Sequence, residues 1–315
     1  MKAAVVLGAG RPPVYQDFSE PTPFGDERLV SIAAAAISPL VRGRASGSHY
    51  SSNGAFPFVA GVDGVGRLAD GSRVYFFLPK APFGAMAERT VVPAAQCLPL
   101  PAELDDVTAA AIANPGMSSW AAYTLRAKLR AGETVLVNGA TGTSGRLAVQ
   151  IAKLLGANKV VATGRNADAL KSLGADVTIL LAADQPTLEN SFREQFADGV
   201  DVVVDYLWGA SAQTLLIAAA KSIESRPLRF VQIGSSSGSE IALPSAVLRS
   251  APIELMGSGL GSASQDGLLS AISGVLHAAA TQGLTLATRT FALSDLERAW
   301  SLDDSAARTV ILPQA

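Results

Sequence analysis

The residues best suited to bind a ligand lie in a glycine-rich turn between an apolar strand and an amphipathic helix. This segment, Thr134–Ala157, reads TVLVNGATGTSGRLAVQIAKLLGA. Gly142 and Gly145 occupy the second and third glycine positions of the dinucleotide fingerprint G-x-G-x-x-G. Ala140 stands at the first position, and Gly139 precedes it. Glycine here permits a tight turn and close approach of the backbone to a pyrophosphate, and the helix N-terminus favours an anion. The turn therefore predicts a dinucleotide site.

The choice between NAD and NADP should be readable at the end of the next strand, Lys159–Thr163. An acidic residue there binds the ribose 2′-hydroxyl of NAD, whereas a cation accommodates the 2′-phosphate of NADP. Arg165 follows Gly145 by 20 residues, and no Asp or Glu lies between Gly145 and Asp168. A guanidinium suits phosphate, so the sequence predicts NADPH, with Lys171 as a second candidate cation. The expected contacts in this part of the chain are Ala140, Thr141, Gly142, Thr143, Ser144, Gly145, Gly164, Arg165 and Asn166.

Composition sets wider limits on fold and partners. A chain of 315 residues with 49% hydrophobic content is expected to form two domains. A net charge of −2 without a Lys/Arg run argues against nucleic acid as a partner. No apolar stretch reaches the length of a membrane span, and the first ten residues lack the pattern of a signal peptide, so we expect no membrane partner and a cytoplasmic location.

Two patterns of secondary structure divide the chain. The region before about residue 110 is rich in Gly and Pro, with short β-like runs at Lys2–Val6, Leu29–Ala36, Gly64–Ala69, Arg73–Phe77 and Ala87–Val92. From about 115 to 250, helical segments at Gly145–Leu155, Ala167–Leu173 and Ala210–Ser222 alternate with strands at Thr134–Val137, Lys159–Thr163, Val177–Ile179, Val200–Val204 and Arg229–Ile233. The first pattern predicts an antiparallel β domain, and the second predicts a doubly wound α/β domain with a parallel sheet.

Several motifs in this order resemble the medium-chain dehydrogenase/reductase superfamily and its zinc-free quinone oxidoreductase branch. They are Gly61-Val62-Asp63-Gly64-Val65-Gly66, Asp70-Gly71-Ser72-Arg73-Val74, Gly84-Ala85-Met86-Ala87-Glu88, the helix Asn114–Tyr123 and the glycine turn. The resemblance implies a Rossmann nucleotide-binding domain over residues 113–250. It also implies a split, GroES-like catalytic domain over residues 1–112 and 251–315, and a homodimer formed by sheet extension at an edge of the cofactor domain near Ile253–Met256.

Zinc-containing members of the superfamily hold a catalytic metal with a cysteine and a His-Glu pair. The corresponding positions here carry Ser38-Pro39-Leu40 and Gly61-Val62-Asp63, which lack the thiolate and the imidazole of such a site. His49 and His277 are the two histidines of the chain, and neither lies in a ligand motif. We therefore expect no metal.

The expected reaction is hydride transfer from NADPH to a small electrophilic acceptor, either a quinone or an α,β-unsaturated carbonyl. The resemblance places Ser118 and the loop residues Gly234, Ser235 and Ser236 near the nicotinamide. Ser38 and Tyr50 are the candidate catalytic groups, as proton donor or carbonyl contact. The family usually has asparagine where Ser38 falls, which puts a quinone acceptor in doubt.

Other functions stay open from the sequence. Phe58, Phe77, Trp120 and Trp208 are candidates to wall an apolar acceptor pocket. An enoyl thioester or alkenal is an alternative acceptor, and a CoA-like substrate would call for a basic pair, for which Arg42 and Arg44 are the candidates, although a solvated loop is also consistent with them. A sensor that binds NADPH without turnover is a third possibility, because no residue is demanded as a catalytic acid.

Overall fold

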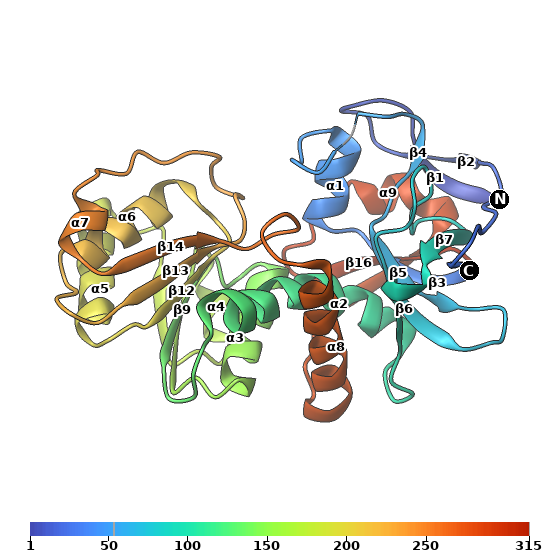
Figure 1. The fold of residues 1–315 in the computed structure, drawn as a ribbon. Helices are drawn as coiled ribbons and strands as arrows, with labels where there is room; N and C mark the ends of the chain where they lie inside the picture. The colour runs from blue at the N-terminus through green and yellow to red at the C-terminus, as the bar shows by residue number, and fades with distance from the viewer. Residues whose placement is uncertain (53, 315) are drawn as a thin grey trace. The chain divides into compact units, whose positions relative to one another are not determined.

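The computed structural model describes residues 1–52 and 54–314 and divides into two compact units (Figure 1). One unit comprises Met1–Pro115 with Ile272–Ala315, and the other comprises Gly116–Ala271. The sequence predicted the second boundary at residues 250/251, but the strand Ile253–Gly257 pairs with Leu228–Gln232 and so extends the second unit. The first boundary falls inside a helix, three residues beyond the predicted position.

The unit Gly116–Ala271 is built on one parallel sheet. Its strands are β9 (Thr134–Asn138), β10 (Lys159–Gly164), β11 (Val177–Leu180), β12 (Val202–Asp205), β13 (Leu228–Gln232) and β14 (Ile253–Gly257). They run in the order β11-β10-β9-β12-β13-β14, which is the 3-2-1-4-5-6 order of a Rossmann sheet. The order reverses between β9 and β12, so the carboxyl ends of these two strands flank the point where such sheets bind ligands.

Helices cover both faces of the parallel sheet, and Figure 1 shows α5, α6 and α7 gathered together, apart from α3. The helices of this unit are α3 (Thr143–Leu154), α4 (Ala167–Lys171), α5 (Gln185–Ala197), α6 (Gly209–Ala220) and α7 (Val247–Ser250). The segment of α5 had no assignment from sequence. Asp184 caps it through the Thr187 N–H, and Leu188, Phe192 and Phe196 recur every four residues and pack under the sheet.

The unit Met1–Pro115 with Ile272–Ala315 is mainly antiparallel. Its strands are β1 (Lys2–Val6), β2 (Val14–Asp17), β3 (Glu27–Ala36), β4 (Phe58–Val59), β5 (Asp63–Arg67), β6 (Arg73–Phe77), β7 (Arg89–Pro93), β8 (Cys97–Pro99), β15 (Thr288–Ala292) and β16 (Arg308–Leu312). They form a sheet β2-β1-β4 and a larger sheet β15-β16-β3-β5-β6-β8, in which β7 also pairs with β3. Thus β16, from the end of the chain, completes a sheet begun by the first hundred residues.

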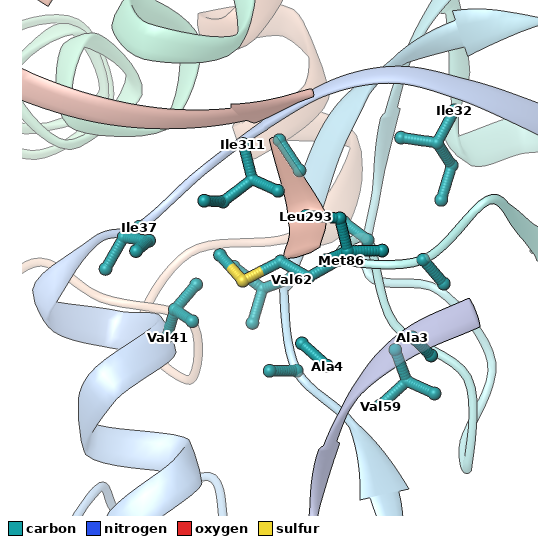
Figure 2. Close-up of a cluster of buried hydrophobic side chains, with 14 of the residues drawn as sticks. Ala3, Ala4, Ile32, Ile37, Val41, Val59, Val62, Met86, Leu293 and Ile311 are labelled. Atoms are coloured by element: carbon teal, nitrogen blue, oxygen red, sulfur yellow. The ribbon is translucent and has the colours of Figure 1, made fainter. Parts of the chain in front are cut away.

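Small and branched apolar side chains fill the core of this unit. Figure 2 shows ten labelled members of the cluster: Ala3, Ala4, Ile32, Ile37, Val41, Val59, Val62, Met86, Leu293 and Ile311. The helical segments are α1 (Pro39–Ser46), α9 (Leu296–Trp300) and the short turns η1 (Ala94–Gln96) and η3 (Leu293–Asp295). Two helices cross the division between the units: α2 (Asp106–Ala121), which continues as η2 (Ala122–Ala127), and α8 (Gln265–Gln282).

The predicted fold class is confirmed: a Rossmann-type parallel sheet accompanies a mainly antiparallel β unit. Across the described ranges 1–52 and 54–314, no helix combines the length and apolar character needed to cross a membrane.

Candidate cofactor and acceptor sites

Gly139 gives the turn between β9 and α3 its shape. Its φ of +90° lies in the left-handed region, where glycine carries no penalty. A Cβ on Gly145 would lie 2.3 Å from the Gly139 carbonyl oxygen and 2.6 Å from Ala140 Cα, so the helix approaches the turn as closely as backbone atoms allow. The tight-turn role therefore falls to Gly139, which explains why the fingerprint tolerates Ala140.

Ala140 and Gly164 hold this turn against the neighbouring strand. Ala140 is fully buried, and its N–H donates to the Thr163 carbonyl at 2.8 Å. A Cβ on Gly164 would lie 2.5 Å from Thr141 Cγ2. Both residues thus act through the shape of the turn, and Gly164 is small because Thr141 packs onto it.

The space above Gly142 suits a pyrophosphate. A Cβ there would have one neighbour within 4 Å, the Gly139 oxygen at 3.9 Å, so the backbone is open to a ligand. Gly142 is also the N-cap of α3, and as a glycine it makes no side-chain cap bond to the helix. Arg146 Nε donates to the Thr141 carbonyl at 3.1 Å, which fixes the turn from the helix side. An open glycine before a helix N-terminus is the arrangement that binds phosphate.

A buried polar network, which the sequence analysis missed, joins three strand ends beside the turn. Asn138 Nδ2 donates to Asp205 Oδ1 at 2.7 Å, and Thr163 Oγ1 donates to Asn138 Oδ1 at 2.7 Å. Thr163 Oγ1 in turn accepts the Gly139 N–H at 3.1 Å. Asn138 and Asp205 are each 0% exposed. The signal in the sequence was a polar residue closing each of two apolar strands, and its consequence is a rigid start to the glycine turn.

Asp205 also anchors the loop that follows β12. Its carboxylate accepts the N–H groups of Leu207 at 3.0 Å and Trp208 at 3.0 Å. Burial raises the pKa of Asp205 to about 6, although these hydrogen bonds oppose the rise. Trp208 has a φ of +56°, a strained conformation for a tryptophan, and the hydrogen bonds that its N–H donates to Asp205 hold it there.

The end of β10 presents the predicted phosphate-binding cation to solvent. Arg165 is exposed, and within the described part of the chain its side chain makes no ion pair or hydrogen bond. Asn166 is not available in the same way, because its side chain caps α4 by accepting the Ala169 N–H at 2.9 Å. Lys171 pairs with Asp168 at 3.4 Å on the exposed face of α4. Arg165 is therefore the better placed of the two candidate cations.

The loops after β12 and β13 lie against each other. A Cβ on Gly234 would lie 2.7 Å from the Tyr206 carbonyl oxygen, and Ser236 Oγ donates to that oxygen at 3.0 Å. Burial raises the pKa of Tyr206 to about 12, and Ser118 partly offsets this rise. Ser235 is exposed. The predicted cofactor residues of this unit thus gather at the carboxyl edge of the parallel sheet, with Ser118 beside the loop that follows β12.

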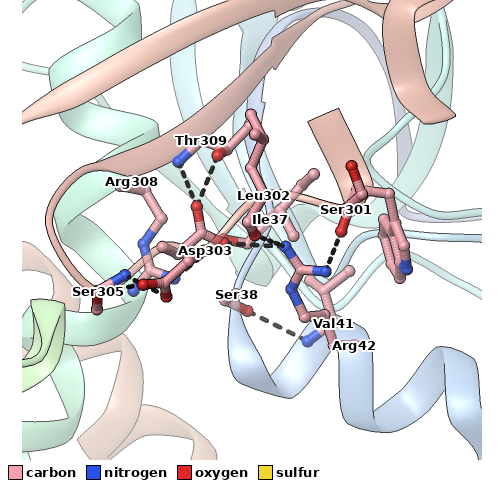
Figure 3. A network of polar contacts seen from close by, with 12 residues as sticks. Ile37, Ser38, Val41, Arg42, Ser301, Leu302, Asp303, Ser305, Arg308 and Thr309 are labelled. Atoms are coloured by element: carbon pink, nitrogen blue, oxygen red, sulfur yellow. Dashed lines mark hydrogen bonds and ion pairs between the residues drawn. The ribbon is translucent and has the colours of Figure 1, made fainter. Parts of the chain in front are cut away.

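Ser38 sits at the start of α1 in the other unit, where β16 holds it in place. Its Oγ caps the helix by accepting the Val41 N–H at 3.2 Å, and the side chain is 4% exposed. The buried Arg308 donates from Nη1 to the Ile37 carbonyl at 2.9 Å, which fixes the backbone just before Ser38 (Figure 3). The Ser38 hydroxyl keeps its own proton available to donate, because the cap uses only an acceptor position.

Tyr50 lies beyond the other end of α1. It is 70% exposed, and its ring stacks on His49 with the ring centroids 4.2 Å apart. His49 Nδ1 is 2.8 Å from Ser51 Oγ, and burial, together with the charge of Arg44, lowers the pKa of His49. Ser38 and Tyr50 are thus separated by the length of the helix, so they do not form one catalytic pair through a direct contact.

The β unit also contains a buried carboxylate, Asp63, as the Rossmann unit contains Asp205. Asp63 lies on β5, in the glycine-containing motif Gly61–Gly66. Asp63 accepts from Tyr75 Oη at 2.8 Å and from Asn114 Nδ2 at 2.9 Å, and it is 1% exposed. Burial raises the pKa of Asp63 to about 6. Both oxygens serve internal hydrogen bonds, so Asp63 acts as a structural link between β5, β6 and α2.

The candidate arginines, Arg42 and Arg44, and the four candidate aromatic residues do not form one common site. Arg42 and Arg44 lie on α1 and not in a loop, and Arg42 is held by the carbonyl of Leu302 at 3.0 Å and by Asp304 at 3.3 Å. Phe58 lines a cavity beside α1, whereas Phe77 is 0% exposed in β6. The two candidate tryptophans belong to the Rossmann unit, outside the described lining of that cavity: Trp120 lies on α2 and Trp208 packs against the sheet.

Comparisons with known proteins agree with this architecture. Residues 145–273 match the family model described as zinc-binding dehydrogenase. A quinone oxidoreductase of Thermus thermophilus, solved alone and with NADPH, is 25% identical with a TM-score of 0.82, covering 99% of this chain and 100% of that one. A mycobacterial quinone oxidoreductase, 22% identical with a TM-score of 0.84 over 99% and 100% of the chains, shares the fold.

The residues of this chain do not fit the zinc that the family description names. In the described portions of the chain, no group of three or more His, Cys, Asp or Glu side chains is placed to hold a metal ion. Ser38 is occupied as a helix cap, and Asp63 is occupied by Tyr75 and Asn114. A tetrahedral zinc site needs three or four nitrogen, sulfur or carboxylate ligands, and this donor set does not supply them.

The most extensive sequence match among these relatives spans the whole chain. A probable NADPH-dependent quinone reductase, tdiC, from Emericella nidulans is 30% identical, and the match covers 99% of this chain and 100% of the relative. The Rossmann strand order, the glycine turn and this match lead to one assignment. The chain belongs to the medium-chain dehydrogenase/reductase superfamily, in its quinone oxidoreductase-like branch.

Proposed function

We propose that this protein is an NADPH-dependent oxidoreductase that reduces a quinone or an α,β-unsaturated carbonyl without zinc. The observation that carries the proposal is the open turn at Gly142, joined at the same sheet edge by the exposed Arg165, whose side chain makes no ion pair or hydrogen bond within the described residues. The full-length similarity to a probable NADPH-dependent quinone reductase supports the same cofactor and reaction. Relatives named as alkenal/one oxidoreductase and quinone oxidoreductase support both acceptor classes.

The Rossmann unit would bind the cofactor through its backbone and one cation. The N–H groups at the start of α3, from Thr143 to Gly145, would bind the pyrophosphate, and Arg165 would bind the 2′-phosphate. The loop from Gly234 to Ser236 and Ser118 would contact the nicotinamide end. When bound, NADPH supplies the hydride, and the protein orients the reactants and keeps water out.

The split β unit would contribute the groups that face the acceptor. Reduction of a carbonyl-conjugated acceptor builds negative charge on oxygen, and a hydroxyl donor stabilises that charge. The Ser38 hydroxyl still has its proton to donate while it caps α1, and Arg308 holds the adjacent backbone rigid. Tyr50 is solvent-exposed, so it is suited to deliver a proton from bulk water. We assign carbonyl contact to Ser38 and proton delivery to Tyr50.

We propose a cytoplasmic homodimer as the working form, with β14 as the contact edge. Among the described residues β14 pairs with β13 alone, so it is the edge strand of the parallel sheet, where a second copy of the strand could pair. Leu255 on this strand is 38% exposed, which gives the edge an apolar contact.

The test is oxidation of NADPH and NADH, followed at the nicotinamide absorbance, with 1,4-benzoquinone, 9,10-phenanthrenequinone, an alkenal and crotonyl-CoA, each with and without a chelator. We expect turnover that prefers NADPH and is unaffected by the chelator. Turnover abolished by the chelator and restored by zinc would overturn zinc independence. Tight NADPH binding without turnover of any acceptor would make the protein a sensor. Selective use of crotonyl-CoA would make it an enoyl-thioester reductase.

A further inference from the structure

A cavity of about 110 Å³ lies beside α1 in the split β unit. Val41, Val59 and Val62, drawn in Figure 2 as part of the core, line it, and each is no more than 3% exposed. The other described uncharged lining residues are aromatic, proline or small; the larger ones are Phe56, Pro57, Phe58, Pro79, Pro82 and Phe83. An engineered apolar cavity of about 150 Å³ holds benzene, so this space suits a single ring or a short branched chain.

One charged residue, Arg44, completes the described lining of the cavity. It is half-buried, and among residues 1–52 and 54–314 its guanidinium makes no ion pair or hydrogen bond. Its neighbour Arg42 differs in this respect, because Asp304 and the Leu302 carbonyl hold it. Figure 3 shows Arg42 turned toward the segment that contains these partners. The chain thus neutralises one arginine of α1 and leaves the other facing an apolar cavity.

A guanidinium in this position favours an anion. Burial lowers the pKa of Arg44, and the group remains charged because its ordinary pKa is so high. No described residue replaces the hydration that the guanidinium of Arg44 loses, so a ligand carboxylate that forms two parallel N–H···O bonds would gain more here than on the open surface. His49 is a poor competitor for that anion, because burial, together with the charge of Arg44, lowers its pKa and disfavours the charged imidazolium.

We propose that this cavity binds the acidic end of the acceptor: a small aromatic or branched apolar group that carries a carboxylate, with Arg44 as the specificity-determining residue. The apolar walls take the ring or chain, and Arg44 takes the carboxylate. The proposal rests on the reductase activity proposed above, and it narrows the acceptor class from any electron-poor carbonyl to an acidic one.

The first test measures binding without turnover, using benzoate as the probe and benzamide as its neutral counterpart. Calorimetric titrations would compare the wild type with Arg44→Gln, Arg44→Lys and Arg28→Gln, the last removing a surface arginine outside the cavity lining. We expect benzoate to bind more tightly than benzamide to the wild type and to Arg28→Gln. Arg44→Gln should weaken benzoate by about tenfold or more, with Arg44→Lys intermediate, as expected for loss of a charge-assisted hydrogen bond. Equal benzoate affinity in wild type and Arg44→Gln, or no benzoate binding to the wild type, would overturn the proposal.

The second test asks whether the cavity belongs to the acceptor. Benzoate should inhibit quinone reduction competitively with the quinone in the wild type and in Arg28→Gln, and Arg44→Gln should relieve this inhibition. Inhibition that is not competitive with the acceptor would refute the acceptor assignment. Absence of NADPH oxidation with every acceptor would refute the proposed function instead, and the benzoate titrations would still decide the cavity.

Discussion

Arg165 and Asp205 lie at the same sheet edge, but Arg165 is exposed to solvent, whereas Asp205 is buried and bonded to internal donors. Arg165 is an exposed cation with no ion pair or hydrogen bond to the residues that the structure describes, so its charge is available to a ligand. Asp205 is a buried carboxyl group whose oxygens are filled by internal donors. The first type of residue is visible in a sequence from its place after a strand. The second requires the partner strands to be known, because Asn138 and Asp205 are 67 positions apart and meet only when β9 pairs with β12.

Replacing Arg165 by alanine should weaken NADPH binding by about tenfold or more, because a hydrogen bond to a charged group contributes about 1.5–3 kcal/mol. The affinity for NADH, which lacks the 2′-phosphate, should stay within about twofold. Fluorescence titration of both cofactors gives the two constants. Lys171→Ala is the matched control, because Lys171 already pairs with Asp168, and it should change neither. An NADPH affinity unchanged in Arg165→Ala would show that the 2′-phosphate binds elsewhere.

The raised pKa of Asp205 predicts a specific pH dependence of stability. The pKa of Asp205 is about 6 in the folded state, and its ordinary value is 3.8. Between these two pH values the folded protein therefore keeps a proton on Asp205 that the unfolded chain has already released. The contribution of this proton to the free energy of unfolding is fully present below about pH 4 and is lost as pH rises through about 6. It amounts to at most about 3 kcal/mol. Denaturant unfolding at several pH values should therefore show wild type losing stability relative to Asp205→Asn across this window. Parallel pH profiles for the two proteins would contradict the prediction.

At the level of elements, periodicity predicted most of the strands and much less of the loop chemistry. The strands Lys2–Val6 and Arg73–Phe77 fall where the sequence predicted them. The helix α5 was missed although Asp184 and the apolar spacing of Leu188, Phe192 and Phe196 were present, because its remaining residues are polar. β14 lies just beyond the predicted domain boundary at residues 250/251 and coincides with the sheet edge predicted near Ile253–Met256. A strand pattern does not say which sheet it joins, and the pairing with β13 decides that.

In the turn between β9 and α3, alanine at Gly145 should lower thermal stability, whereas alanine at Gly142 should weaken NADPH binding. A methyl group at Gly145 would meet the Gly139 oxygen at 2.3 Å, so Gly145→Ala should push α3 off the sheet and lower the Tm by several degrees. Gly142 has a φ of −75° and an open Cβ position, so Gly142→Ala should fold normally. It should nonetheless weaken NADPH by about tenfold, because the methyl group occupies the space meant for phosphate.

Thermal unfolding and cofactor titration of both variants test this pair. A loss of stability in Gly142→Ala comparable with that in Gly145→Ala would mean that the space above Gly142 is structural. Unchanged NADPH affinity in Gly142→Ala would move the pyrophosphate away from this turn.

At the level of the whole molecule, the proposed dimer depends on the free edge of β14. Leu255→Lys places a charge on that edge and should give a monomer in analytical ultracentrifugation at concentrations where the wild type is dimeric. Leu248→Lys is the control, because Leu248 is equally apolar and 46% exposed but lies on α7. A dimer that survives Leu255→Lys, or a monomeric wild type, would remove β14 as the contact.

The division of the β unit between the two ends of the chain has a consequence for synthesis on the ribosome. Residues 116–271 form one unit and emerge as a continuous stretch, so this unit can fold while translation continues. The first 115 residues must wait for β16, because Arg308 holds the backbone before Ser38 and Asp304 holds Arg42. Until β16 is made, β3 lacks one neighbouring strand and the apolar cluster lacks Ile311. A nascent chain stopped short of β16 is therefore a natural client for chaperones, even with a fully folded nucleotide-binding unit.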